Sequence, residues 1–359
     1  MPEVNVYLIG GGVIAQQHAA AAAKLGVKAN LHVTDLNHQA IEAFVAKFPA
    51  ARTFDSLDAM LAQPPRDNDI VINATPPFAH FKPTLAALES GRHVLCEKPL
   101  AMNRDEAVRM LDAARKHDRM LGDCSCRFLN LAAAREAKRI IESGVIGVPY
   151  HITWINRRHR ARSGIEYQPQ SRWFLDATKS GGGVVMDWGP YDIAALVELL
   201  EPTQMDVVHA WVATPKTGAD PTEMKLTTEQ HASARLIFHR KDTSVIPVRY
   251  ERAACTHGYE TNVVEVEGDH GAVSWDWLGG GKVRHTRDVE GKAQTSTTEH
   301  PDTDGLSPHD KPLLFFHRRI RGENVPAIVN QQAVFNFSCL RATYDAATTG
   351  KPQSVHLES

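Results

Sequence analysis

The sequence predicts an α/β protein of two domains, a doubly wound parallel sheet followed by an α+β domain with a largely antiparallel sheet. Strand-like and helix-like segments alternate over the first 123 residues, which is the pattern of a parallel sheet covered by helices. Beyond residue 145, extended segments rich in Val, Ile, Thr and aromatic residues follow one another with few helices between them. A length of 359 residues suffices for two domains. We therefore expect domains at residues 1–123 and 124–359.

The composition is that of an ordinary globular protein. Hydrophobic residues make up 43% of the chain and charged residues 23%, and the formal net charge is −2. This balance gives no electrostatic reason to expect a nucleic-acid or membrane partner, and no run of about 18 apolar residues predicts a membrane span. The first predicted strand begins at Val4, which leaves no room for a signal peptide. We therefore expect a cytoplasmic protein.

A glycine-rich turn follows the first predicted strand, residues 4–9. The sequence Gly-Gly-Gly-Val-Ile-Ala at residues 10–15 matches the pattern G-x-G-x-x-G/A, and a predicted helix follows it over residues 14–25. In this setting the glycines permit a tight turn and close approach of a pyrophosphate, and the helix N-terminus favours the anion. The pattern predicts a Rossmann domain that binds a dinucleotide. The residues expected to contact it at this turn are Gly10, Gly12, Val13 and Ile14.

An acidic residue ends the second predicted strand, residues 29–34. Asp35 lies twenty residues beyond Ala15, where a carboxylate would bind the adenosine ribose. Residues 36–38 are Leu, Asn and His, so no basic side chain there offsets the repulsion of a 2′-phosphate. We expect the cofactor to be NAD rather than NADP.

Two further predicted strands end in residues suited to ligand binding. The strand at residues 69–75 is broken by Thr75 and Pro76, where we expect the nicotinamide ribose. The strand at residues 93–96 is followed by Glu97-Lys98-Pro99. The carboxyl ends of parallel strands form the edge at which open α/β sheets bind ligands, and a proline stiffens the turn that presents the lysine. A capping box at residues 103–106 predicts a helix to about residue 117.

The cysteines do not form a disulfide or metal framework. Their number is odd and their spacing irregular, which favours reduced thiols. Cys124 and Cys126 resemble half of a metal site, and on the expected strand at residues 120–126 both thiols would face one side. No second Cys/His pair is spaced to complete tetrahedral zinc, so we favour core thiols and expect no metal. The five cysteines are Cys96, Cys124, Cys126, Cys255 and Cys339.

The second half contains the segments expected to build the second sheet. We expect strands at residues 150–156, 205–214, 231–239, 245–252 and 261–277, and helices at residues 313–321 and 331–347. All six tryptophans fall in this half. Some could stack on a sugar ring, but for most of them packing against helices or a partner subunit is the favoured interpretation.

Three glycines at residues 181–183 precede a second candidate set of functional residues. The glycines permit close approach of another backbone, which we expect to be the nicotinamide region. Asp187 and Tyr191 are four residues apart and share a face if the segment is helical. Pro190 means that the helix is either kinked or begins near it. A phenol with an ordinary pKa of about 10 is a poor base, but an ammonium such as that of Lys98 would lower its pKa.

Together these motifs resemble the glucose–fructose oxidoreductase/inositol dehydrogenase/MocA (Gfo/Idh/MocA) family. The features that carry the resemblance are the glycine-rich turn, Thr75-Pro76-Pro77 with His80, Glu97-Lys98-Pro99, and the glycine run with Asp187 and Tyr191. The resemblance covers nearly the whole chain. It implies a C-terminal open-faced mixed sheet that often forms the oligomer interface, and NAD(P)-dependent oxidation or reduction of sugars, polyols and related hydroxy compounds.

The resemblance also implies roles for particular residues. Lys98 matches the family lysine that contacts nicotinamide ribose and substrate, and Asp187 matches the substrate-site aspartate. Many members carry His where this chain has Tyr191, and Asp where it has Ala194, so this chain is similar to the branches in which tyrosine is the acid/base. The expected catalytic residues are Lys98, Asp187 and Tyr191. The further expected cofactor contacts are His80 and Glu97, and the further expected substrate contacts are Arg127, Arg158 and Trp173.

Several alternatives remain open from the sequence. The basic segment at residues 157–162 could bind an anion, although a solvated loop is favoured. An NAD-retaining glycosidase that oxidises, eliminates and re-reduces is an alternative activity, but its expected His signature is not seen. A non-catalytic regulator that senses cofactor and sugar is a second alternative, against which Lys98 and Tyr191 argue. The resemblance implies a homo-oligomer, either a dimer or a tetramer formed through the C-terminal sheet.

Overall fold

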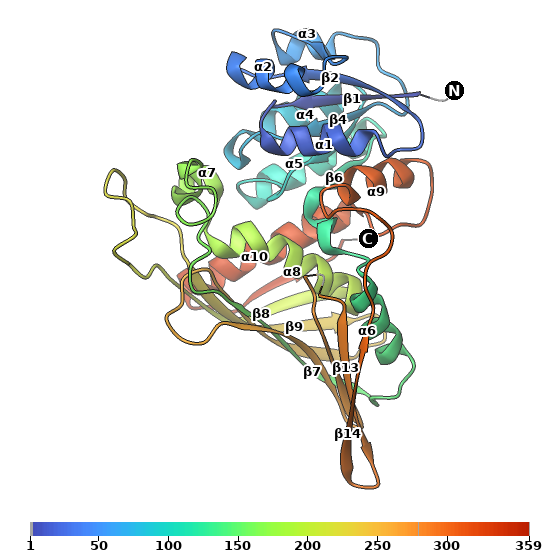
Figure 1. Cartoon of the computed structure of the whole chain (residues 1–359), viewed down its shortest axis with the longest axis vertical. Coiled ribbons are helices and arrows are strands. Elements are labelled where there is room, and N and C mark those ends of the chain that lie inside the picture. Colours follow the sequence, from blue (N-terminus) through green and yellow to red (C-terminus); the bar gives the residue numbers. More distant parts are fainter. Residues whose placement is uncertain (1–2, 279, 359) are drawn as a thin grey trace. The chain divides into compact units, whose positions relative to one another are not determined.

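The computed structural model describes residues 3–278 and 280–358, which form two compact units (Figure 1). The first unit comprises Met1–Arg127 and Leu306–Phe337, and the second comprises Phe128–Gly305 and Ser338–Ser359. The expected boundary at residue 123 lies close to the observed one, but the expected second domain wrongly included the return segment 306–337. Over the described residues, no helix combines the length and the apolar character that crossing a membrane requires.

The first unit contains a seven-stranded sheet in the order β15-β6-β5-β4-β1-β2-β3. All neighbours pair in parallel except β15, which is antiparallel to β6. The strand order reverses at β1, between β2 and β4, and such a switch point is where doubly wound sheets bind ligands. The strands are β1 (Glu3–Ile9), β2 (Lys28–Thr34), β3 (Arg52–Thr53), β4 (Ile70–Asn73), β5 (His93–Cys96), β6 (Leu121–Asp123) and β15 (Ile328–Val329).

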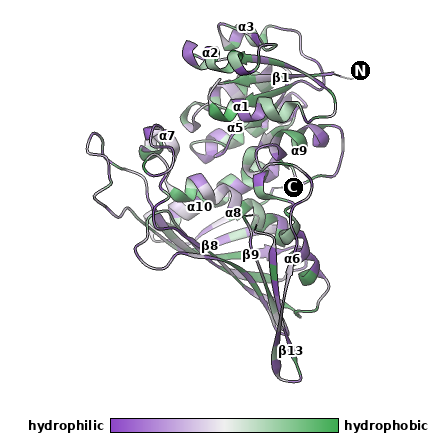
Figure 2. Ribbon diagram, viewed as in Figure 1, coloured by the Kyte–Doolittle hydropathy of each residue, from purple (hydrophilic) through white to green (hydrophobic). Residues whose placement is uncertain are grey.

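Helices connect these strands and bury their apolar residues on the sheet. Helix α9 carries both hydrophobic and hydrophilic residues (Figure 2), and its Leu313 and Phe316 belong to the same buried core as β1 and β4. This burial explains why the return segment joins the first unit, because apolar surface removed from water stabilises the packed state. The helices are α1 (Val13–Ala22), α2 (His38–Lys47), α3 (Leu57–Leu61), α4 (Phe81–Glu89), α5 (Arg104–Lys116) and α9 (Lys311–Ile320), with short 3₁₀ helices η1 (Pro77–Ala79) and η2 (Cys124–Phe128).

Local sequence signals explain the ends of two of these elements. The Asn103 side chain accepts the Glu106 N–H at 3.0 Å at the start of α5, as the capping pattern predicted. The strand expected at residues 120–126 is shorter, because the chain turns into η2 after Asp123. The Asp123 carboxylate accepts the Ser125 N–H at 2.6 Å, which stabilises that turn. The expectation that Cys124 and Cys126 lie on a strand was therefore wrong.

The second unit contains a nine-stranded sheet in the order β14-β13-β12-β11-β7-β10-β9-β8-β16. Among the described strands of this sheet only β7 and β10 pair in parallel, so the prediction of a largely antiparallel mixed sheet is confirmed. The strands are β7 (Pro149–Arg157), β8 (Pro202–Ala213), β9 (His231–Arg240), β10 (Val245–Ala253), β11 (Thr261–Gly268), β12 (Gly271–Trp275), β13 (Lys282–Val289), β14 (Lys292–Glu299) and β16 (Gln353–His356).

Helix α8 packs against β9 and β10, and α6 packs against β12 and β13. The other short helices of this unit lie in the connection between β7 and α8. The helical elements are α6 (Ala132–Glu142), η3 (Arg172–Leu175), α7 (Ala177–Ser180), α8 (Val184–Leu200) and α10 (Gln331–Thr349), and the division between the two units falls within α10.

The segment expected as a single strand at residues 261–277 forms two strands. β11 and β12 pair as a hairpin, with Gly268 opposite Gly271 and Asp269-His270 at the turn. The following β13–β14 hairpin was not expected, and Figure 1 shows it extending from the rest of the sheet. Every residue of β14 is exposed, so this strand has no buried face to produce an alternating hydrophobic pattern.

Candidate active site

The glycine-rich turn between β1 and α1 has the geometry of a phosphate cradle. Gly10 has a φ of +100°, and a Cβ there would lie 3.1 Å from the Ala74 carbonyl oxygen at the end of β4. Gly12 is the N-cap of α1, makes no side-chain cap and has open space around its Cα. The first N–H groups of a helix have no partner within the helix, so this end of α1 can bind an anion. The turn therefore fits the pyrophosphate of a dinucleotide.

Asp35 lies beside this turn, directly after β2. Its carboxylate accepts the Gly11 N–H at 2.7 Å and the Asn37 N–H at 2.8 Å. These two hydrogen bonds hold the carboxylate at the carboxyl edge of the sheet, next to the phosphate cradle. Leu36 is fully exposed and follows it directly. A carboxylate after the second strand of such a sheet is suited to accept hydrogen bonds from the hydroxyls of an adenosine ribose.

Glu97 is the centre of a buried charge cluster at the end of β5. Its Oε1 binds His18 Nε2 of α1 at 2.8 Å and the Arg127 guanidinium, and its Oε2 accepts the Lys98 N–H at 3.1 Å. Burial by itself raises the pKa of the Glu97 carboxyl, but the charges of Arg127 and His18 overcome this and hold the pKa well below its usual range. Glu97 is therefore an anion that fixes the backbone of Lys98.

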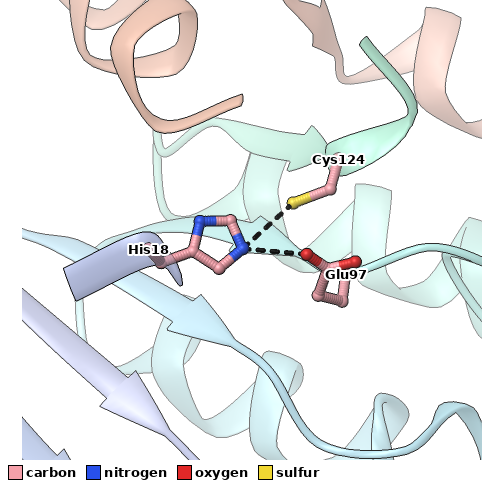
Figure 3. A group of neighbouring side chains, drawn as sticks. All are labelled: His18, Glu97 and Cys124. Carbon is pink, nitrogen blue, oxygen red and sulfur yellow. Dashed lines mark hydrogen bonds and ion pairs between the residues drawn. The ribbon is translucent and has the colours of Figure 1, made fainter. Parts of the chain in front are cut away.

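His18, Glu97 and Cys124 also form a group whose ligand atoms lie within 4.8 Å of one another (Figure 3). Cys124 Sγ lies 3.9 Å from His18 Nε2. The Arg127 guanidinium pairs with the same Glu97 oxygen as His18, where its positive charge repels a metal cation. Burial raises the pKa of the Cys124 thiol well above its usual range. The contacts therefore support an ion-pair cluster rather than a metal centre.

The turn after β4 is joined to the turn after β5 through His80. The His80 ring is fully buried, and its two nitrogens lie 2.8 Å from the Thr75 carbonyl oxygen and 2.9 Å from the Pro99 carbonyl oxygen. Burial lowers the pKa of this imidazole. Thr75 and Pro76 themselves are partly exposed. His80 thus contacts the backbone of both turns, and these contacts support a role in holding the two turns together.

Asp123 is a further buried carboxylate at this edge of the sheet, and the sequence reasoning did not single it out. It ends β6 and is paired in register with Cys96, the residue before Glu97. Burial raises the pKa of its carboxyl to about 6. The available signal was an acidic residue within a predicted apolar strand. The prediction placed Asp123 inside the strand at residues 120–126 and did not treat it as the end of that strand.

Helix α8 carries both candidate catalytic residues of the second unit. Pro190 lies inside the helix, and Asp187 and Tyr191 are one turn apart on it. The Ser163 hydroxyl donates to the Asp187 carboxylate at 2.5 Å. Tyr191 is only 4% exposed, and its ring packs edge-on against Phe128, with centroids 5.0 Å apart. The helix therefore presents a carboxylate and a phenol from one face, as the four-residue spacing predicted.

The other candidates of the second unit differ in exposure. Trp173 is partly buried and stacks on Phe174 with centroids 3.9 Å apart, and Arg158 is exposed. Arg162 was expected in a solvated loop, but its side chain is 1% exposed and pairs with Glu166 and Asp220. That part of the expectation was wrong, because two acidic partners compensate the buried guanidinium.

The predicted residues thus fall into two groups. In the first unit, the residues after β1, β2, β4 and β5 share the carboxyl edge of one sheet, because all four strands are parallel. In the second unit, the fold brings together Asp187 and Tyr191 on α8, while Arg158 and Trp173 lie on separate segments. Sequence reasoning also missed His18 and Glu229, since each contacts residues far away in the chain.

Two family models match the chain. Residues 4–123 match a model described as "Oxidoreductase family, NAD-binding Rossmann fold" of the Gfo/Idh/MocA group, and residues 134–274 match the C-terminal domain model of the same group. The two matches together span most of the chain and fall separately on its N-terminal and C-terminal parts.

Individual proteins agree with these models. The chain is 25% identical over 354 residues to 1,5-anhydro-D-fructose reductase of Ensifer adhaerens, which covers 97% of each chain. It is 33% identical over 201 residues to D-glucoside 3-dehydrogenase of Escherichia coli, covering 55% of this chain and 54% of that one. A solved structure of levoglucosan dehydrogenase with NADH and levoglucosan has the same fold, with a TM-score of 0.79 at 19% identity over 99% of this chain and 100% of that one. The chain belongs to the Gfo/Idh/MocA family of NAD-binding oxidoreductases.

Proposed function

We propose that this protein transfers hydride between NAD and a carbinol or carbonyl carbon of a sugar, glycoside or polyol. The observation that carries the proposal is the uncapped N-terminus of α1, held beside the fixed Asp35 carboxylate in a chain of this family. The names of the relatives supply the substrate class, since they include an anhydrofructose reductase and a glucoside dehydrogenase.

We assign the proton of the reaction to Tyr191 and Lys98. The bound nicotinamide would supply the hydride acceptor or donor. As the carbinol C–H bond breaks, the Tyr191 phenolate takes the hydroxyl proton and a carbonyl forms, and carbonyl reduction uses the same groups in reverse. The Lys98 ammonium stabilises the phenolate, and Asp187 orients the substrate hydroxyl or the phenol. The Lys98 N–H donates to the Glu97 carboxylate, which supports a fixed backbone position from which the lysine side chain extends.

Further residues are proposed as contacts of the ligands. Trp173, which is partly buried, would stack on a sugar ring, and the exposed Arg158 would bind hydroxyl or acidic groups. Arg127 is proposed to reach the substrate in addition to pairing with Glu97. On the cofactor, Thr75 and Pro76 are proposed to line the nicotinamide ribose, and Val13 and Ile14 the pyrophosphate.

An assay with NAD and a panel of sugars, followed at 340 nm, tests the function. Net formation of NADH with one sugar would support the dehydrogenase. Release of a sugar from a glycoside without net NADH would support the glycosidase alternative, and the absence of both would leave the sensing regulator. The same panel run with NADH and the corresponding ketones tests the reverse direction.

Tyr191→Phe tests the assignment of the proton. The substitution removes one oxygen and little volume, so we expect a folded protein that binds NADH and turns over about 10²–10⁴ times more slowly. Tyr259→Phe is a matched control, because Tyr259 is 92% exposed. Turnover at the wild-type rate in Tyr191→Phe would contradict the mechanism.

The preference for NAD is proposed to depend on Asp35. Titrating NADH and NADPH by fluorescence should show tighter binding of NADH, and Asp35→Ser should narrow the difference, because it removes the repulsion of a 2′-phosphate. Equal affinities in the wild-type protein would overturn this assignment.

We also propose a cytoplasmic homo-oligomer, a dimer or tetramer that associates through the nine-stranded sheet. Exposed apolar side chains on β8, namely Val208, Trp211 and Val212, support an interface there. The five buried cysteines suit a reducing compartment. Sedimentation velocity should show an assembly that Trp211→Glu weakens, and a wild-type monomer at micromolar concentration would contradict it.

A further inference from the structure

The first turn of α8 is capped by a residue far away in the sequence. Gly183, the N-cap of this helix, has no side chain with which to cap it. Instead, the Glu229 carboxylate accepts the Gly183 N–H at 2.7 Å and the Val185 N–H at 3.0 Å, and the Glu229 backbone carbonyl accepts the Val184 N–H at 3.1 Å. Three consecutive N–H groups that a helix leaves without internal partners are therefore bound by one residue.

The glycines before α8 make this contact possible. A Cβ on Gly183 would lie 1.7 Å from the Glu229 carbonyl oxygen, and a Cβ on Gly182 would lie 2.2 Å from the Tyr344 hydroxyl. The distance at Gly183 is to backbone and is too short for any side chain, and a side chain at Gly182 would displace Tyr344. The close backbone that the glycine run accommodates is therefore that of Glu229 within the same unit, whereas the sequence had suggested the nicotinamide region.

Glu229 is held in a buried, polar environment. It is 6% exposed, and the Tyr344 hydroxyl donates to its Oε1 at 2.7 Å. Burial raises the pKa of the carboxyl, while Tyr344 and the helix N–H groups act in the opposite direction. The positive end of the α8 dipole favours a carboxylate at this point.

A second buried anchor lies on the next turns of α8. Asp192 is fully buried, and its carboxylate accepts from the Arg252 guanidinium at 2.5 and 2.6 Å, from the Trp154 indole at 2.9 Å and from the Tyr250 hydroxyl at 2.8 Å. The helix is thus fixed by Glu229 at its first turn and by Arg252 at its third.

Asp187 and Tyr191 lie on α8 between these two anchors. We propose that Glu229 is a positioning residue, which sets the place of the Asp187 carboxylate and the Tyr191 phenol by fixing the first turn of α8. This inference rests on the proposed function. Errors of about 1 Å in the placement of catalytic groups cost about 10²-fold in rate, so the cap should act on turnover and not on cofactor binding.

Glu229→Gln tests the proposal, because it keeps the shape of the side chain but turns one acceptor oxygen into a donor that faces an N–H or hydroxyl group. We expect kcat to fall about 10- to 100-fold, the affinity for NADH to change less than about twofold, and the amides of residues 183–185 to exchange with solvent at least about tenfold faster. Asp69→Asn is the control, since Asp69 is a fully buried carboxylate at the opposite, amino end of β4, bound to Asn5 at 2.8 Å. It should destabilise the protein without lowering kcat.

Several results would overturn the proposal that Glu229 positions Asp187 and Tyr191. Wild-type kcat in folded Glu229→Gln, or unchanged exchange of these amides, would overturn the proposal, and so would an equal fall of kcat in the Asp69→Asn control. If Glu229→Gln does not fold, Tyr344→Phe, which removes one hydrogen bond to the carboxylate, should still lower kcat by about two- to fivefold with NADH binding unchanged. A wild-type protein inactive toward every sugar would overturn the proposed function, whereas the exchange rates would still report whether the cap exists.

Discussion

Each unit contains a buried glutamate next to candidate catalytic residues, and the two carboxylates are compensated by different kinds of partner. Glu97 directly follows β5 beside Lys98, and Glu229 caps the helix that carries Asp187 and Tyr191. Glu97 pairs with the Arg127 guanidinium and with His18, whereas the partners of Glu229 are a phenol and backbone N–H groups. Accordingly the pKa of Glu97 is held below its usual range and that of Glu229 is raised, although burial raises both.

The difference shows what compensates a buried carboxylate. A full positive charge at hydrogen-bonding distance outweighs the loss of hydration, whereas dipoles of N–H and O–H groups offset only part of it. Glu97 should therefore stay ionised throughout the physiological pH range, and the stability of the fold should depend strongly on its pairing with Arg127. Glu229 should tolerate neutralisation better, because no buried cation is paired with it in the described contacts.

The largest expected effect in this comparison is that of Glu97→Gln. The substitution leaves the buried Arg127 guanidinium without its counter-charge, and removing one partner of a buried ion pair costs about 3–5 kcal/mol. Urea unfolding of the two variants should show a much larger loss for Glu97→Gln than for Glu229→Gln. Glu142→Gln, in an exposed i,i+4 pair with Lys138, is the control and should lose less than about 1 kcal/mol. If the free energy of unfolding falls no more in Glu97→Gln than in Glu229→Gln, the expected difference between an ion-paired and a hydrogen-bonded carboxylate is wrong.

Asp123 extends the comparison to a third buried carboxylate, whose pKa burial raises from 3.8 to about 6. Since the folded state binds this proton more tightly than the unfolded state, the group stabilises the fold fully below pH 3.8, and that stability is lost as the pH rises through 6. A shift of about two units corresponds to about 3 kcal/mol. Asp123→Asn should therefore raise the free energy of unfolding at pH 7.5 relative to wild type and flatten its fall between pH 4.5 and 7.5.

Urea unfolding at several pH values measures this effect. The asparagine can still accept the Ser125 N–H, so the turn into η2 should remain. An Asp123→Asn variant that is less stable than wild type at pH 7.5 would show that the charged form is favoured in the fold, contrary to the expected sign.

Among the three buried carboxylates, the smallest expected effect on stability is that of Glu229→Gln. It exchanges one hydrogen-bond acceptor and removes no counter-charge, so we expect a loss of about 1–2 kcal/mol at neutral pH. Because the folded pKa of Glu229 is raised, wild-type stability should decline as the pH rises above the ordinary range of a glutamate, and the variant should lack this part of the decline. A loss as large as that of Glu97→Gln would mean that Glu229 is paired with a positive charge.

The sequence by itself determined the parts of this protein that depend on neighbours in the chain. The glycine-rich turn, the carboxylate after β2 and the Glu97-Lys98 pair were found because strand periodicity, tight turns and helix N-termini are local properties. The prediction that Asp187 and Tyr191 share one face of a helix depended on a local property as well, because residues four apart in a helix lie on the same face.

Only the tertiary structure decided which distant groups compensate one another. His18 and Arg127 reach Glu97 from 79 and 30 residues away, Glu229 reaches Gly183 across 46, and the return segment with α9 completes the first unit. None of these contacts has a signature in its own stretch of sequence, and the exposed β14 has no hydrophobic pattern at all. Burial, hydrogen bonding and ion pairing between distant segments are properties of the packed chain, because the partner that offsets the cost of burying a charge is supplied by the fold.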